Sequence, residues 1–407
     1  MNPKVNFHRL WETLETHGQI GGTAAGGVCR ETLTEKDKEG RDVFIRWCED
    51  AGLAVAIDRL GNIYARRAGI DDSLDPVAIG SHLDTQPTGG KYDGILGVLG
   101  GLEVVRALND AQITTHRPIM LVNWTNEEGS RFVPSMLGSG VYSGVFTQEA
   151  MLNQRDDQGV SVDEALQAIG YAGPEEVGAR RFHKFLELHI EQGPVLEQKQ
   201  VEIGVVTGSQ AMNWSEVTIV GRPAHAGTTP MPNRLDPMGA TVRLLNRLYD
   251  TANSIQAACA TIGSITTTPA SHSTIPKVVK FLLDLRHPSE ERLKEIVAAF
   301  EQWAGEERDK GFKITRSEFG VAAEQRFADD CVAAIRESAI EGGYSHTDII
   351  SGAGHDAIYL NAVCPTGMIF VPCKNGVSHN PAESITPEQA FAGVDVLLRT
   401  VVKLSAV

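Results

Sequence analysis

The sequence has 407 residues, which is long for one compact core and predicts two domains. Hydrophobic residues make up 42% of the chain and charged residues 22%, the composition of an ordinary globular protein. The formal net charge of -15 argues against nucleic acid or an anionic membrane surface as a partner, although a few local cations can still bind a small anionic substrate.

The N-terminal segment, residues 1–20, predicts an amphipathic helix with Leu10, Trp11 and Leu14 on one side. It lacks the apolar core of a signal peptide, and no stretch of the sequence is long enough to span a bilayer. Six cysteines are scattered without a CxxC pair or a zinc-finger spacing, as expected for buried free thiols in a reducing compartment. The sequence therefore predicts a cytoplasmic protein.

Short apolar strands alternate with longer helical stretches over residues 53–206. Strands are predicted over residues 76–80, 118–124 and 185–190, and they lead into SHLDT, TNEEG and EQGP. The apolar spacing of residues 94–108 predicts a helix whose glycines permit close packing on a sheet. Polar residues beside glycine at the end of each strand are typical of an α/β sheet that carries its site at the strand ends.

The pattern changes near Asn213 and predicts a small inserted domain. Its predicted elements are a strand over 214–220, a helix over 237–249, strands over 258–265 and 278–286, a helix over 290–310 and a strand over 312–319. That β-α-β-β-α-β order is typical of a ferredoxin-like domain. We therefore expect a lid domain over residues 213–327, inserted into a catalytic domain formed by residues 1–212 and 328–407, which ends in a helix over 387–404.

Four segments carry side chains that divalent metal ions favour, each placed where an apolar strand gives way to a loop. They are His82 with Asp84 and Asp93, Glu127 with Glu128, His189, and His379. A lone histidine at a strand end is more often a structural residue, and paired glutamates usually lie in a solvated loop. Loops at the carboxyl edge of a sheet converge, however, so the four sets together predict a metal site.

The mixture of residue types matches the chemistry of a two-metal hydrolase. Imidazoles and a few carboxylates bind zinc-like ions, and a carboxylate shared by two ions holds them about 3.5–4 Å apart. A further carboxylate is needed to take a proton from the attacking water. Adjacent glutamates can divide these tasks, because one binds metal while its neighbour reaches the water.

Several motifs between about residues 82 and 383 occur together in a recognisable order: GSHLDTQPTGGKYDG, NEEGSRF, LHIEQGPVLE, GRPAHAGTTPM and SHNPAE. In these motifs the sequence resembles the hydantoinase/carbamoylase branch of the metal-dependent amidohydrolases and exopeptidases. That branch holds N-carbamoyl-L-amino acid hydrolases, β-ureidopropionases and allantoate amidohydrolases. The resemblance implies a zinc exopeptidase-like catalytic domain, with a mixed sheet and helices on both faces, and a homodimer formed through the lid.

The resemblance also implies two divalent ions per subunit. Zn²⁺ is the expected metal, and Mn²⁺, Co²⁺ and Ni²⁺ are compatible with the same ligands. By this resemblance His82 and His189 would bind one ion, Glu128 and His379 would bind the other, and Asp93 would bridge them. Histidine at position 189 favours the carbamoylases, because peptide-cleaving relatives more often carry a carboxylate there.

Two further roles near the metals follow from the same resemblance. Asp84 would hydrogen-bond and orient His82, and Glu127 would act first as general base and later as general acid.

His225 and Arg286 are two of the candidate residues in the lid. His225 in GRPAHAGTTPM is either an ordinary turn histidine or, by the resemblance, the group that stabilises the tetrahedral oxyanion. Arg286 is either an exposed cation or, by the resemblance, the clamp for a substrate carboxylate. Gln192, Gly352 and Gly354 resemble positions that line the substrate pocket.

One position departs from the family pattern. Relatives usually carry asparagine two residues before the Ile-Pro of the lid, where its amide contacts the substrate. This sequence has Ser273 there with His272 beside it, and by the resemblance both are candidate substrate-binding residues. Serine is shorter and offers one hydroxyl in place of an amide. Either His272 or a water compensates, or the substrate differs, or the alignment is displaced by one residue.

The predicted activity is hydrolysis of an N-carbamoyl-L-amino acid or N-carbamoyl-β-alanine to the amino acid, ammonia and carbon dioxide. Allantoate amidohydrolase activity, or dipeptidase or aminoacylase activity on the same metals, remains an alternative. A scaffolding protein that had kept the fold would be expected to lose Glu127 or a metal ligand, and none of these is lost.

Overall fold

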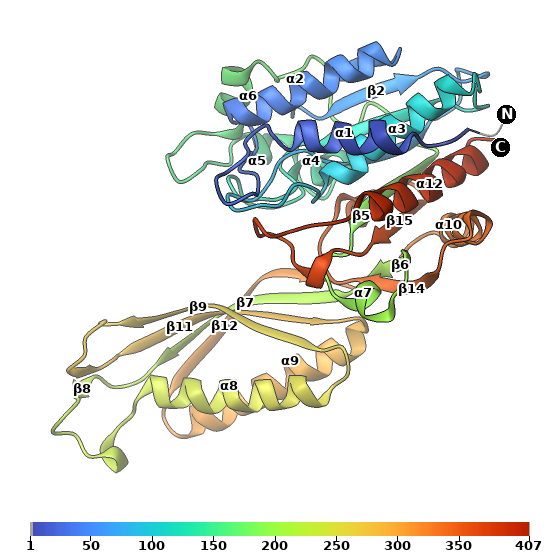
Figure 1. Ribbon diagram of the computed structural model, residues 1–407. Helices are drawn as coiled ribbons and strands as arrows, with labels where there is room; N and C mark the ends of the chain where they lie inside the picture. Colours follow the sequence, from blue (N-terminus) through green and yellow to red (C-terminus); the bar gives the residue numbers. More distant parts are fainter. Residues whose placement is uncertain (1–2, 407) are drawn as a thin grey trace. The chain divides into compact units, whose positions relative to one another are not determined.

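The structure is a computed structural model that describes residues 3–406 (Figure 1). Its contacts divide the chain into two compact units. The first unit runs to Gly208 and resumes at Arg326, and the second is Ser209–Gln325. The second unit covers nearly the stretch expected for the lid, whose function as a lid stays a prediction.

The first unit is built on a mixed sheet in the order β1-β2-β4-β3-β5-β15-β6-β13, with β14 paired to β6. Its strands are β1 (Ala54–Ile57), β2 (Ile63–Arg67), β3 (Val77–His82), β4 (Ile119–Trp124), β5 (Lys184–Ile190), β6 (Ile203–Ser209), β13 (Gln325–Arg326), β14 (His346–Ser351) and β15 (Thr366–Val371). Strands β4, β3, β5 and β15 are mutually parallel, whereas β2 and β6 join them antiparallel. All residues of these four parallel strands are buried, as expected for strands covered on both faces.

Helices cover both faces of this sheet. They are α1 (Phe7–His17), α2 (Glu35–Asp50), α3 (Ile95–Asp110), α4 (Leu137–Tyr142), α5 (Gln148–Leu152), α6 (Val162–Ile169), α7 (Val195–Lys199), α10 (Asp329–Gly342), α11 (Asp356–Leu360) and α12 (Pro387–Leu404). Helices α3 and α12 pack on the face that carries Leu188. Helix α11 lies on the opposite face, where its Ala357 N–H donates to Glu187. Successive residues of a strand point to opposite faces, so these two neighbours mark the two layers.

Close packing of α3 on the sheet depends on its glycines. A Cβ at Gly97 would lie 2.4 Å from the carbonyl oxygen of Leu188, and one at Gly101 would lie 2.9 Å from Ile79. Any larger side chain at these two positions would clash with the sheet. Helix α3 therefore begins directly above the ends of β3 and β5.

The second unit is a four-stranded antiparallel sheet with two helices on one face (Figure 1). Its elements are β7 (Ala211–Val220), β8 (Ala224–His225), α8 (Pro237–Ser254), β9 (Cys259–Thr268), β10 (Thr274–Ile275), β11 (Val278–His287), α9 (Glu290–Asp309) and β12 (Lys313–Ala322). The order β12-β7-β11-β9 is that of a ferredoxin-like domain. Alternate residues of β7 and β11 are buried, and they pack with apolar residues of α8 and α9 in one core.

The predicted strands and helices after residue 53 agree with these bounds to within five residues, and α12 begins and ends where expected. The helix predicted over residues 1–20 is shorter, Phe7–His17, and residues 1 and 2 lie outside the described part of the chain. All six cysteines are free, as expected, but Cys259 is exposed and Cys29 is only half-buried. Among the described residues no helix is both long and apolar enough to cross a membrane.

Candidate metal centre

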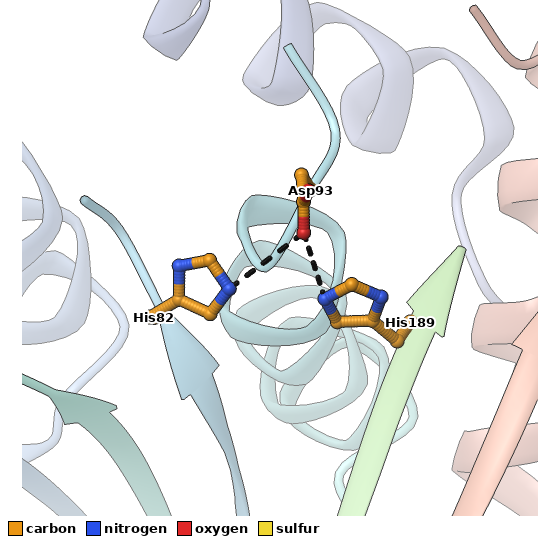
Figure 2. Close-up of side chains that lie close together, drawn as sticks. All are labelled: His82, Asp93 and His189. Atoms are coloured by element: carbon orange, nitrogen blue, oxygen red, sulfur yellow. Dashed lines mark ion pairs between the residues drawn. The ribbon is translucent and has the colours of Figure 1, made fainter. Parts of the chain in front are cut away.

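Three predicted ligands meet at the ends of two neighbouring strands (Figure 2). His82 is the last residue of β3, His189 lies near the end of β5, and Asp93 projects between them from the loop before α3. The Asp93 Oδ1 atom lies 3.0 Å from Nε2 of His189 and 3.7 Å from Nε2 of His82. All three side chains are buried, and their donor atoms are close enough to hold one metal ion.

Strand register explains why the two histidines meet. Strands β3 and β5 are parallel neighbours with Val77 opposite Lys184, an offset of 107 residues that also separates His82 from His189. Gly94 then allows the Asp93 loop to approach. Its φ is +72°, and a Cβ there would lie 2.3 Å from Nε2 of His82. Only glycine fits both the conformation and the space.

A second group of ligands uses the other oxygen of Asp93. Its Oδ2 atom lies 3.4 Å from Nε2 of His379, which is 3.3 Å from Oε2 of Glu128. These three residues also form a group that could hold a metal ion. The two groups share Asp93, as expected for a bridging carboxylate.

The hydrogen bonds of the two buried histidines leave the correct nitrogen for a metal. Nδ1 of His82 lies 2.9 Å from the main-chain oxygen of Asp84, and Nδ1 of His189 lies 2.9 Å from that of Ile190. A carbonyl oxygen can only accept, so each Nδ1 carries a proton, and Nε2, which faces Asp93, is the nitrogen that can bind a metal in place of a proton. Metal-binding histidines are typically held in this way.

The charge of the site also suits a cation. The buried carboxylates are Asp84, Asp93, Glu127 and Glu128, and among residues 3–406 none of them forms a salt bridge with a lysine or arginine. Hydrogen bonds with Asp93 and Glu128 raise the pKa of His379 to about 10. Burial lowers the pKa of His189, but Asp93 outweighs it and raises that pKa to about 9. The same negative potential that holds a proton on these imidazoles attracts a divalent ion, so the residues fit such an ion.

Glu127 lies beside the ligands. Its Oε2 atom is 3.5 Å from Nε2 of His82, and burial raises the pKa of Glu127 well above its usual value, with the carboxylates of Asp356 and Glu128 acting in the same direction. A carboxylate with a raised pKa is suited to accept and later return a proton.

Asp84 differs in detail from the prediction. Its carboxylate lies 3.8 Å from Nδ1 of His82, and the hydrogen bond to that ring goes to the main-chain oxygen of Asp84 instead. The carboxylate accepts the N–H groups of Glu127 at 3.4 Å and Glu128 at 3.3 Å. Asp84 therefore joins the His82 turn to the paired glutamates.

Four residues form hydrogen bonds beside the metal ligands, a role that the sequence analysis did not predict for any of them. Gln192, expected in the substrate pocket, donates to Asp93 Oδ2 at 2.8 Å, and so does Ser378 at 2.8 Å. Gln86 donates to Glu128 at 2.8 Å, and the oxygen of Glu383 lies 3.0 Å from the Ser378 hydroxyl, which can donate to it in place of Asp93. The sequence could have indicated Ser378 and Glu383, because both lie with His379 in the motif SHNPAE.

His355 is a further buried group that the prediction did not single out. Its ring centroid lies 4.4 Å from that of His189, and with Glu187 and His189 it forms a third group within reach of one ion. Burial lowers the pKa of His355 well below its usual value, so the ring is neutral. Gly352 and Gly354 precede it in the same loop, and Gly354 packs against Met136.

The remaining predicted site residues belong to the second unit. His225 pairs with Thr274 between β8 and β10, which brings it next to Ser273, while His272 and Ser273 are exposed. Nδ1 of His225 accepts from the N–H of Gly227 at 3.0 Å, so in the neutral ring Nε2 carries the proton and can donate.

Arg286 lies on the face of β11 opposite α8 and α9. Its Nη2 atom donates to Asp284 at 2.8 Å, and its guanidinium carbon lies 5.8 Å from the ring centroid of Trp214. These contacts hold the planar group in a defined orientation.

Comparison with known proteins finds likeness along the whole chain. A family model described as peptidase family M20/M25/M40 matches residues 78–403. An N-carbamoyl-L-amino-acid amidohydrolase of Rhizobium meliloti is 45% identical, over 100% of this chain and 98% of that protein. An allantoate amidohydrolase of Bacillus subtilis (strain 168) is 33% identical, over 97% of each chain. The crystal structure of an amidase of the hydantoinase/carbamoylase family from Burkholderia multivorans matches with a TM-score of 0.93 at 47% identity, over 99% of each chain.

Proposed function

Because this chain belongs to peptidase family M20/M25/M40 and to the hydantoinase/carbamoylase family of amidases, we propose that it hydrolyses N-carbamoyl amino acids to the amino acid, ammonia and carbon dioxide. The observation that carries the proposal is the sharing of Asp93 by two ligand groups with Glu127 beside them. Both N-carbamoyl-L-amino acids and N-carbamoyl-β-alanine fall within the proposed class.

We further propose that the site holds two divalent ions, of which Zn²⁺ is the favoured metal. The ligands would be His82, Asp93, His189, Glu128 and His379. Histidine nitrogen and carboxylate oxygen are zinc ligands, and they also accept Mn²⁺, Co²⁺ and Ni²⁺. Such ions lower the pKa of water and polarise the carbonyl to be attacked.

The protein's own groups then handle the proton and the developing charge. Glu127 accepts the proton of the attacking water and returns it to the leaving nitrogen, the order in which a carboxyl group of raised pKa can act as base and then as acid. His225 donates its Nε2 proton to the oxyanion, a role worth about 10²–10³ in rate for a single donor.

A substrate panel tests the proposed function. Purified, metal-loaded protein would be assayed with N-carbamoyl-L-amino acids, N-carbamoyl-β-alanine, allantoate and dipeptides, and kcat/KM should be highest for an N-carbamoyl amino acid. A clear preference for allantoate would favour the second candidate, which the likeness to the Bacillus subtilis enzyme supports. A preference for dipeptides would contradict the proposal.

The proposed homodimer would form through the second unit. Strand β9 (Cys259–Thr268, CATIGSITTT) lies at an edge of its sheet and carries no charge and no proline to block pairing with another strand. Sedimentation should therefore show a species of about 88 kDa, twice the 44.0 kDa of one chain. A monomer at micromolar concentration would contradict this part of the proposal.

Arg286 is expected to bind the carboxylate of the substrate. Arg286→Ala should lower kcat/KM by roughly 10- to 150-fold, because a charge-assisted hydrogen bond contributes about 1.5–3 kcal/mol. Arg286→Lys should lose nearly as much, because lysine keeps the charge but not the planar two-point fork. Steady-state kinetics on N-carbamoyl substrates would measure both variants.

An amidated substrate, which lacks the carboxylate, completes the cycle for Arg286. The native enzyme should use it poorly, and Arg286→Ala should reduce that rate little further. Lys280 provides a matched control, since it lies on the same face of β11 in an ion pair with Glu216 and its removal should change little. An equal penalty on the acid and the amide would show that Arg286 does not read the carboxylate.

A further inference from the structure

Glu383 joins two loops that carry metal ligands. Its Oε1 atom accepts the main-chain N–H groups of Tyr92 at 3.0 Å and Asp93 at 3.2 Å, and its Oε2 atom accepts the hydroxyl of Ser378 at 3.0 Å. The same Ser378 oxygen lies 2.8 Å from Asp93 Oδ2, so its one hydrogen is shared between the two carboxylates. One carboxylate thus links the loop of the shared Asp93 to the residue before His379, although the two loops lie about 290 positions apart in the sequence.

The space around this carboxylate is shaped to receive it. Glu383 is 5% exposed, and a Cβ at Gly90 would lie 2.0 Å from its carboxyl carbon. Beside it, a Cβ at Gly27 would lie 2.7 Å from Cα of Pro381. Two glycines therefore let the turn of Glu383 pack directly on neighbouring main chain.

His379 needs such support more than the other histidine ligands do. His82 and His189 are buried on strands whose ladder bonds hold them, whereas the side chain of His379 is 51% exposed. His379 also lies outside any helix or strand and has a φ of +53°, a strained conformation for a residue other than glycine. Its position therefore depends on the contacts of the loop that carries it.

We propose that Glu383 is a positioning residue that assembles the ion site formed by Asp93, Glu128 and His379, by tying the Tyr92–Asp93 main chain to Ser378. The inference rests on the proposed two-ion centre. It assigns to Glu383 an effect on one ion site and little effect on the site of His82 and His189.

Glu383→Ala tests the assignment directly. Native protein stripped of metal and titrated with Zn²⁺ in a calorimeter should bind two ions, and the variant should bind one with native affinity and the second about 10- to 100-fold more weakly, the usual penalty for removing a partner of a metal ligand. Metal content after gel filtration should fall from two ions to one. Two ions bound with native affinities would overturn the proposal.

A conservative variant separates tethering from general damage. Glu383→Gln keeps an oxygen for the two N–H groups and can donate to Ser378, so it should bind both ions as the native protein does. Loss of the second ion in this variant would contradict a tether made of these hydrogen bonds. If Glu383→Ala does not fold, Glu383→Asp decides the question: it withdraws the carboxylate by about 1.5 Å, so loss of one ion supports the tether and two native affinities overturn it.

Glu103 offers a matched control. It is a buried glutamate that also joins distant segments, accepting from the main chain of Asn6 at 2.8 Å and pairing with Arg9, and it lies in no ligand group. Glu103→Ala should lower the melting temperature and still bind two ions. Loss of an ion there too would assign the effect to instability and overturn the proposal. Fewer than two ions in the native protein would instead contradict the two-ion centre itself.

Discussion

Glu127→Gln is expected to lower kcat by about 10²–10⁴-fold while both metal ions stay bound. The amide occupies the same space and keeps one oxygen, but it cannot take a proton from water. Glu127 is next to the ligands without belonging to either ligand group, which is why its loss should affect the chemistry more than the metals. Steady-state kinetics with metal analysis on the same sample would measure both quantities.

Glu128→Gln is the paired control. The native Glu128 carboxylate lies close to His379 within the second ligand group. This variant should lose metal, and added Zn²⁺ should restore part of its activity. The opposite pattern, with metal lost from Glu127→Gln and retained by Glu128→Gln, would show that the roles of the two neighbours are exchanged.

Removal of metal is expected to abolish activity completely. Dialysis against a chelator should leave a folded protein without turnover, and Zn²⁺, Mn²⁺ or Co²⁺ should restore the rate. A sample dialysed with chelator already saturated by Zn²⁺ serves as the control. Full turnover in a preparation shown to be free of metal would contradict the proposed mechanism.

The same treatment should lower the melting temperature. Burial raises the pKa of Asp84 to about 8 and that of Glu127 above its usual value. The charged forms of these carboxylates are therefore unfavourable without a cation, and a bound metal ion stabilises them. A ligand at 100 times its Kd stabilises the folded state by about 2.7 kcal/mol. Differential scanning calorimetry of apo and metal-loaded protein would measure the difference.

The main elements of the fold could be predicted because their signals are local. Apolar runs of strand length predicted β3, β4 and β5, and helical spacing with small residues predicted α3. Alternating apolar residues in β7 and β11 predict strands. Together with the helices predicted after them, these strands predicted the ferredoxin-like order of elements. The placement of His82 and His189 at strand ends followed from the same patterns, since parallel strands end at one edge of a sheet.

Only the tertiary structure decided how the candidate site is supported. The contact of Glu383 with Asp93 joins loops about 290 residues apart, and no local periodicity encodes a hydrogen bond between two loops. The bond from His82 to the main-chain oxygen of Asp84, where a carboxylate contact was expected, depends on the path of the turn between them. The sequence by itself determined which side chains end the strands, because residue type and spacing set local structure. Loop conformation is set by long-range packing, and that packing decided which donor meets which acceptor around Asp93.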